Sequence, residues 1–111
     1  MRGIRNIEAE KIIHLIDLVN IKPGIISSMT LLDNSLCHVK LFAATKGESI
    51  GNEIYKGDMV YFLLEGEMLV DIGGKENRLK PGDVLRVRAN IEHMIKAVTS
   101  FKMVQTLIVE E

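Results

Sequence analysis

Turn signals that contain glycine recur through the middle of the chain at intervals of about 8–10 residues. They fall at Gly47, Gly57, Gly66, the pair Gly73 and Gly74, and Pro81 followed by Gly82. Short strands of an all-β sandwich or barrel have this spacing, whereas units that alternate strands and helices do not. The spacing therefore predicts an all-β fold.

The segments between these turns have the composition of β-strands. Residues 59–64 form a continuous apolar run, which is typical of a short strand buried on both faces. Residues 84–87 and 101–109 are rich in apolar and β-branched side chains, and they predict two later strands.

Two pairs of residues predict hairpin turns. Gly73 and Gly74 can both adopt the positive φ of a tight two-residue turn. Asp33 and Asn34 form a turn dipeptide, because their short polar side chains bond to nearby backbone groups. The strands of that hairpin are expected over about residues 25–32 and 36–44.

The N-terminal segment has a different periodicity. Its apolar residues recur at helical spacing: Ile12, Leu15, Ile16 and Val19. We therefore expect a short helix or helical turn ahead of the strands.

The composition narrows the classes of function. With 111 residues, the chain has the length of one domain, and its net charge of −1 lacks the basic excess of a nucleic-acid-binding protein. A single cysteine, Cys37, excludes an internal disulfide. We expect a cytoplasmic protein without a membrane partner, because there is no apolar run of about 18 residues and no signal-peptide core.

Two stretches of the chain resemble the paired motifs of the cupin superfamily. Gly47 and Gly66 match the glycines that bound the first motif. Gly82 and His93 match the second motif, and Asn90 stands where the family has a glycine. Asparagine is a reasonable replacement there because it tolerates the left-handed backbone conformation.

The resemblance covers roughly residues 24–109 and is to short single-domain bacterial cupins of the RmlC-like, cupin-2 type. It implies one cupin domain over residues 1–111, with the motifs at about 46–97. It also implies a double-stranded β-helix, a jelly-roll barrel with a pocket between its two sheets. This agrees with the all-β fold that the turn spacing predicts.

The resemblance also implies a divalent metal, such as iron, manganese, nickel or zinc. Its four ligand positions correspond to Glu53, Tyr55, Met59 and His93, and three of them differ from the family. Methionine is a soft ligand that suits these metals poorly, and tyrosine would have to lose a proton with a pKa near ~10.

Glu53 and His93 remain plausible metal donors, and His38 would be a third if it faced the barrel. Because His38 shares a strand face with Lys40, we expect it at the surface or at a sheet edge. The sequence thus predicts at most a weak metal site and no firm cofactor.

Three functions remain open. The first is a barrel that binds a small organic molecule in a pocket lined by Glu53, Tyr55, Met59 and His93. The second is a metal-dependent enzyme, of dioxygenase or isomerase type, that uses Glu53 and His93. The third is a non-catalytic structural or regulatory module. No catalytic residue is assigned, although Glu53 and His93 could form an acid–base pair without a metal if they lie close together.

Two further expectations concern the surface. Arg86 and Arg88 alternate with Val87, so they project to one face, where they either attract an anionic ligand, form a solvated face, or form a salt bridge between subunits. We also expect a homodimer, because a small barrel has strand edges that need cover. The N-terminal segment is the element expected to cross between subunits.

Overall fold

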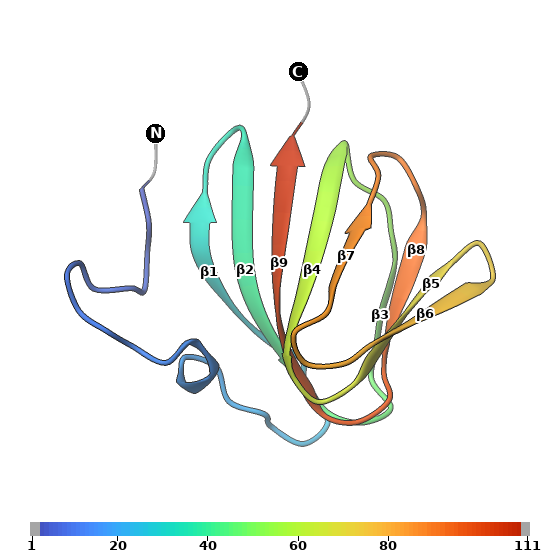
Figure 1. The fold of residues 1–111 in the computed structure, drawn as a ribbon, viewed down its shortest axis with the longest axis horizontal. Coiled ribbons are helices and arrows are strands. Elements are labelled where there is room, and N and C mark those ends of the chain that lie inside the picture. The colour runs from blue at the N-terminus through green and yellow to red at the C-terminus, as the bar shows by residue number, and fades with distance from the viewer. Residues whose placement is uncertain (1–2, 110–111) are drawn as a thin grey trace.

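The computed structural model describes residues 3–109 as two facing antiparallel β-sheets (Figure 1). One sheet has the strand order β1-β2-β9-β4-β7 and the other β3-β8-β5-β6. The strands are β1 (Ser27–Asp33), β2 (Cys37–Ala44), β3 (Ser49–Glu53), β4 (Gly57–Glu65), β5 (Met68–Ile72), β6 (Lys75–Leu79), β7 (Val84–Val87), β8 (His93–Ala97) and β9 (Phe101–Val109). The all-β prediction is confirmed.

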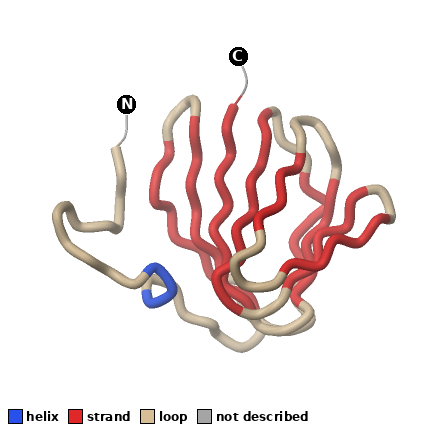
Figure 2. Tube along the Cα trace, in the orientation of Figure 1, coloured by secondary structure: helices blue, strands red, loops and turns tan. Residues whose placement is uncertain are grey.

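The only helical element of the described residues is the 3₁₀ turn η1 (Leu15–Asp17), ahead of the strands (Figure 2). This confirms the short helical turn that the N-terminal spacing predicts. No helix in residues 3–109 is long and apolar enough to cross a membrane.

Local turn chemistry sets both predicted hairpins. The Asn34 side-chain oxygen accepts hydrogen bonds from the backbone N–H groups of Leu36 and Cys37, at 2.9 and 3.0 Å, between β1 and β2. Gly73 and Gly74 have φ values of 60° and 87° between β5 and β6, which is the geometry of a tight hairpin turn.

Two motif positions have a clear backbone reason for their residue type. At Gly66 another backbone segment approaches closely, and at Asn90 the backbone has a positive φ. A Cβ atom on Gly66 would lie 2.0 Å from the Ser100 carbonyl oxygen, so no larger residue fits without movement of the backbone. Asn90 has a φ of 64°, as its place in the motif predicts, and its N–H donates to the Tyr55 carbonyl at 2.7 Å. This hydrogen bond joins the loops of the two motifs.

The main core fills the space between the sheets. In β4, Met59, Tyr61 and Leu63 point inward and are at most 1% exposed, whereas Phe62 is 38% exposed on the outer face. The prediction that residues 59–64 are buried on both faces is therefore wrong. Apolar composition was a poor guide here, because nothing in residues 3–109 covers the outer face of the sheet at Phe62.

The N-terminal segment covers a different part of the outer face. A second apolar cluster forms there, from Val19, Leu31, Leu41 and Ala43. The Lys102 ammonium donates to the Ile16 carbonyl at 2.6 Å and ties the segment to β9. Since the segment lies outside the barrel, it leaves the interior free.

Candidate functional site

A cavity of about 310 Å³ lies between the two sheets. Its lining residues belong to the end of the barrel at which β2 begins and β9 ends, and Figure 1 shows these strand ends. Its wall mixes polar and apolar side chains. Its lining consists of His38, Lys40, Phe42, Ile50, Glu53, Tyr55, Met59, Gln105 and Leu107. The volume is at the lower end of the range for small-molecule sites.

The register of the five-stranded sheet gathers the polar groups. Lys40 on β2 pairs with Gln105 on β9, and Gln105 pairs in turn with Tyr61 on β4. Paired residues on neighbouring strands share one face, so the inward direction of Tyr61 fixes that of Lys40 and Gln105.

His38 is partly at the surface and also lines the cavity. Its side chain is 36% exposed, and its Nδ1 lies 2.9 Å from an Asp33 carboxylate oxygen. β2 lies between β1 and β9, so it is not an edge strand. The lysine on the same strand face suggested that this face is turned away from the interior. The structure shows instead that Lys40 and His38 both line the cavity, which is open enough to solvent to hold a lysine.

Tyr55 and Glu53 form the opposite wall. Burial of the phenol, together with the negative charge of Glu53 and hydrogen bonding to it, raises the pKa of Tyr55 to about 12. A hydrogen bond with Gln105 acts in the opposite direction. At neutral pH Tyr55 is therefore a protonated hydroxyl.

His93 lies in the core and is 3% exposed. Its Nδ1 is 2.9 Å from the Ile91 carbonyl, which can only accept, so Nδ1 carries the hydrogen. In the neutral ring Nε2 then accepts from the Tyr61 hydroxyl at 2.7 Å. Burial raises the pKa of Tyr61 well above its ordinary value, so this hydroxyl keeps its proton. Both nitrogens of His93 are therefore engaged.

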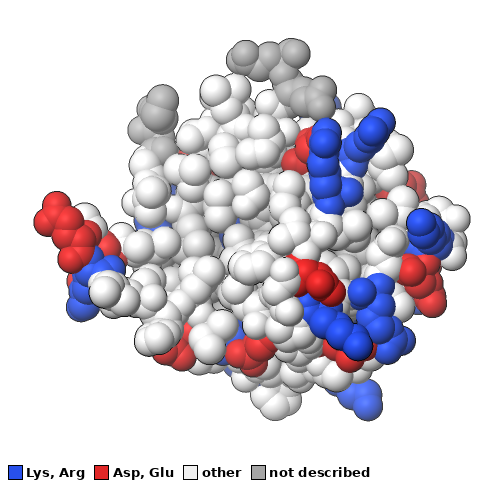
Figure 3. All heavy atoms as spheres, viewed as in Figure 1, with Lys and Arg blue, Asp and Glu red and all other residues white. Residues whose placement is uncertain are grey.

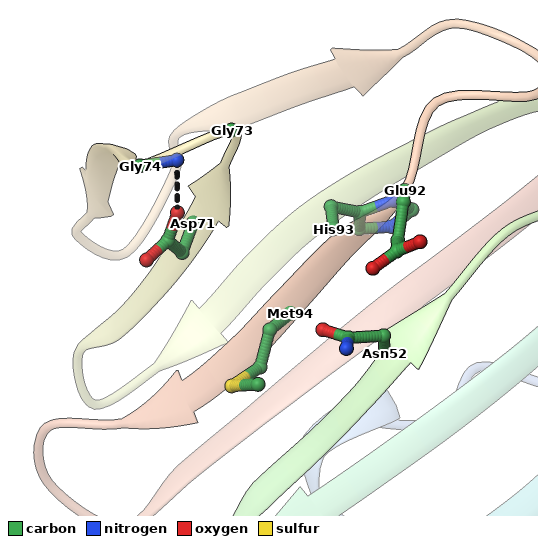
Figure 4. Close-up of a pocket in the computed structure, with 7 residues that line it drawn as sticks. All are labelled: Asn52, Asp71, Gly73, Gly74, Glu92, His93 and Met94. Atoms are coloured by element: carbon green, nitrogen blue, oxygen red, sulfur yellow. Dashed lines mark hydrogen bonds between the residues drawn. The ribbon is translucent and has the colours of Figure 1, made fainter.

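His93 is not among the residues that line the cavity between the sheets. It contacts the cavity wall through the Tyr55 ring, with ring centroids 6.1 Å apart. His93 lines a second, more open hollow of about 280 Å³, together with Asn52, Asp71, Gly73, Gly74, Glu92 and Met94 (Figure 4). The Asp71 carboxylate there accepts from the Gly74 N–H at 2.9 Å, so it serves the hairpin turn (Figure 4).

Of the four residues predicted to share a pocket, Glu53, Tyr55 and Met59 therefore lie together. Sequence reasoning missed Lys40 and Gln105 as cavity residues. Gln105 had a usable signal, since it is a lone amide between the inward-facing apolar residues Met103 and Leu107 of one strand.

The two arginines singled out from the sequence lie away from the cavity. Arg86 pairs with Asp58 on the outer face of the barrel, and Arg88 is exposed. Neither arginine lines the cavity, and Arg86 is paired within its own chain.

Two antiparallel sheets that enclose a cavity at one end define a double-stranded β-helix barrel. The sequence profile described as a cupin domain matches residues 41–109, and the chain belongs to this family. No curated protein matches the chain.

Two solved structures match this chain over nearly the whole of both chains, and a third is matched over about half of its own length. A conserved protein of unknown function from Streptococcus pyogenes is 29% identical, with a TM-score of 0.94 over 100% of this chain and 97% of that one. A cupin superfamily protein from Desulfitobacterium hafniense is 30% identical, with a TM-score of 0.94 over 98% of this chain and 100% of that one. A cupin 2 conserved barrel domain protein from Leptotrichia buccalis is 27% identical, with a TM-score of 0.86 over 91% of this chain and 49% of that one.

The residues at the family's metal-ligand positions do not fit a metal. Met59 is a thioether and both nitrogens of His93 are hydrogen-bonded, which leaves one carboxylate, Glu53, and one phenol, Tyr55. Within residues 3–109, no group of three or more His, Cys, Asp or Glu side chains is arranged to hold a metal ion.

Proposed function

We propose that this cupin binds a small organic molecule in the cavity between its sheets. The observation that carries the proposal is a space of about 310 Å³ at one end of an otherwise packed barrel. Lys40, Glu53 and Gln105 reach it from three different strands, and apolar side chains such as Phe42 and Met59 complete the wall. Apolar walls with a few convergent polar groups are typical of ligand sites.

The alternatives have less support. A purely structural module would not need an open, polar-lined cavity in its core. A metal-dependent enzyme would need Glu53 and His93 as ligands, but the Nε2 lone pair of His93 is taken up by the Tyr61 hydroxyl at 2.7 Å. The same hydrogen bond argues against His93 as a general base, because it leaves no free lone pair to accept a substrate proton.

Two adjacent residues of β9 allow a matched test. Leu107 lines the cavity, whereas Ile108 is 46% exposed on the outer face. Leu107→Trp fills cavity space, and Ile108→Trp adds the same bulk outside. A panel of small acids, sugars and alcohols is screened for thermal stabilisation of the wild-type protein, because a ligand that binds only the folded state must stabilise it.

We expect stabilisation of the wild type and of Ile108→Trp, and its loss in Leu107→Trp. Elemental analysis of protein purified without chelators accompanies the screen. The proposal is wrong if no compound stabilises the wild type, or if Leu107→Trp binds as the wild type does. A metal at about one equivalent per chain would restore the enzyme alternative.

A further inference from the structure

We infer that the cavity is selective for a small hydroxycarboxylic acid, with its carboxylate at Lys40 and a hydroxyl group at Glu53. This inference rests on the proposed function and adds the chemical class of the ligand. It depends on the charges that face the cavity and on the groups that do or do not pair with them.

Lys40 is a cation without an anionic partner among residues 3–109. It is half-buried in the cavity wall, and no carboxylate among residues 3–109 forms an ion pair with it. Three arginines of the described chain, Arg5, Arg78 and Arg86, each pair with a carboxylate at the surface. A partly desolvated ammonium that faces an open cavity favours an anionic group on the molecule that enters.

Glu53 on β3 favours a hydrogen-bond donor on the ligand, whereas Lys40 favours an anion. It interacts with the Tyr55 hydroxyl and, within residues 3–109, it forms no ion pair. An ionised carboxylate can only accept hydrogen bonds, so its remaining lone pairs favour a donor on the ligand and disfavour a second carboxylate. Gln105 can donate and accept between the two charged groups.

The apolar part of the wall and the volume limit the size of the molecule. Phe42, Met59 and Leu107 offer apolar contact beside the polar groups. A space of about 310 Å³ corresponds to roughly ten water molecules at about 30 Å³ each. A molecule with about that many non-hydrogen atoms, acidic at one end and hydroxylated at the other, meets all of these requirements.

Four six-carbon probes separate the requirements: gluconate has a carboxylate and hydroxyls, hexanoate the carboxylate alone, sorbitol the hydroxyls alone, and 6-aminohexanoate a carboxylate and an ammonium. Titration calorimetry measures each against the wild type, Lys40→Met and Glu53→Gln. Lys96→Met is the matched control, because Lys96 is exposed on β8 and does not line the cavity.

We expect gluconate to bind the wild type and Lys96→Met at least about tenfold more tightly than the other three probes. Lys40→Met should weaken gluconate binding by about tenfold or more, the usual effect of losing one charge-assisted hydrogen bond. Glu53→Gln should narrow the difference between gluconate and hexanoate. Thermal unfolding of ligand-free Lys40→Met serves as a folding control, and we expect it to match or exceed the wild type, since the substitution removes an unpaired charge.

Tighter binding of sorbitol, or gluconate binding that Lys40→Met does not change, would overturn the inference and leave the proposed function standing. A preference for 6-aminohexanoate would assign the site to amino acids and overturn the hydroxyl requirement. If the screened panel yields only uncharged ligands, the inference fails as well. If nothing in the panel binds, the proposed function itself fails.

Discussion

The hydrogen bond between Tyr61 and His93 joins the two sheets through the barrel interior, because Tyr61 belongs to β4 and His93 to β8. The substitution Tyr61→Phe removes the hydroxyl and keeps the ring. It leaves Nε2 of a histidine that is 3% exposed without a donor. In the wild-type protein, every buried side-chain nitrogen and oxygen of the described residues has a hydrogen-bond partner.

The cost follows from this orphaned acceptor. Leaving a buried polar group unsatisfied costs about 1–3 kcal/mol. For a domain of this size, 1 kcal/mol corresponds to a shift in Tm of roughly 4 °C. We therefore expect Tyr61→Phe to lower Tm by about 4–12 °C, measured by calorimetry at neutral pH.

Tyr55→Phe is the control, because its hydroxyl is at the half-buried cavity wall, where water can replace it. We expect a loss below about 1 kcal/mol for this variant. The reasoning is refuted if the two variants lose equal stability. It is also refuted if ¹⁵N spectra of the wild type show that Nε2 of His93 carries the hydrogen.

Three further predictions follow from other parts of the molecule. The pKa of Tyr55 is raised from 10.0 to about 12 in the folded protein. The stability that its protonated form contributes is therefore present below pH 10.0 and is lost as the pH rises toward about 12. The absorbance at 295 nm should show no tyrosinate in the folded protein until the pH passes 10.0. Gly66→Ala should destabilise more than Gly82→Ala in urea unfolding: both glycines have positive φ, which costs about 1–2 kcal/mol with a side chain, but only the Cβ at Gly66 meets a backbone oxygen, at 2.0 Å. We also propose that the chain is a homodimer, because the central part of the outer sheet face carries few charges (Figure 3) and exposes Phe62 and Val84. Sedimentation should give a dimer that Phe62→Glu dissociates, and a monomeric wild type at micromolar concentration would contradict this.

The parts of the fold that could be predicted are those that local chemistry determines. Asn34 bonds to the backbone of its own turn, and Gly73 and Gly74 need no distant partner to adopt positive φ. The error at residues 59–64 has a non-local cause. Whether the outer face of a strand is covered depends on where the N-terminal segment crosses the sheet. The residues of the strand itself do not determine that course.

The site was predicted less completely for the same reason. Alternation places His38 and Lys40 on one face of a strand, but it does not say which face is the interior. A lysine usually indicates water, and here the water is at the mouth of a cavity. Gln105 identifies the inward face, because it pairs with Lys40 on one side and Tyr61 on the other. That information resides in the strand register and is absent from any single segment.

His93 shows why a motif locates a residue better than it assigns its role. The place of His93 at the start of β8 follows from the spacing of the preceding loop, and both belong to one continuous stretch of sequence. Its chemistry depends on Tyr61, which is 32 residues away in the chain and 2.7 Å away in the fold. With a hydroxyl donor at Nε2 and the Ile91 carbonyl at Nδ1, the imidazole becomes a link between the sheets. The polar side chains of the proposed binding cavity are then Lys40, Glu53 and Gln105. Of these three, only Glu53 occupies a position of the cupin motifs.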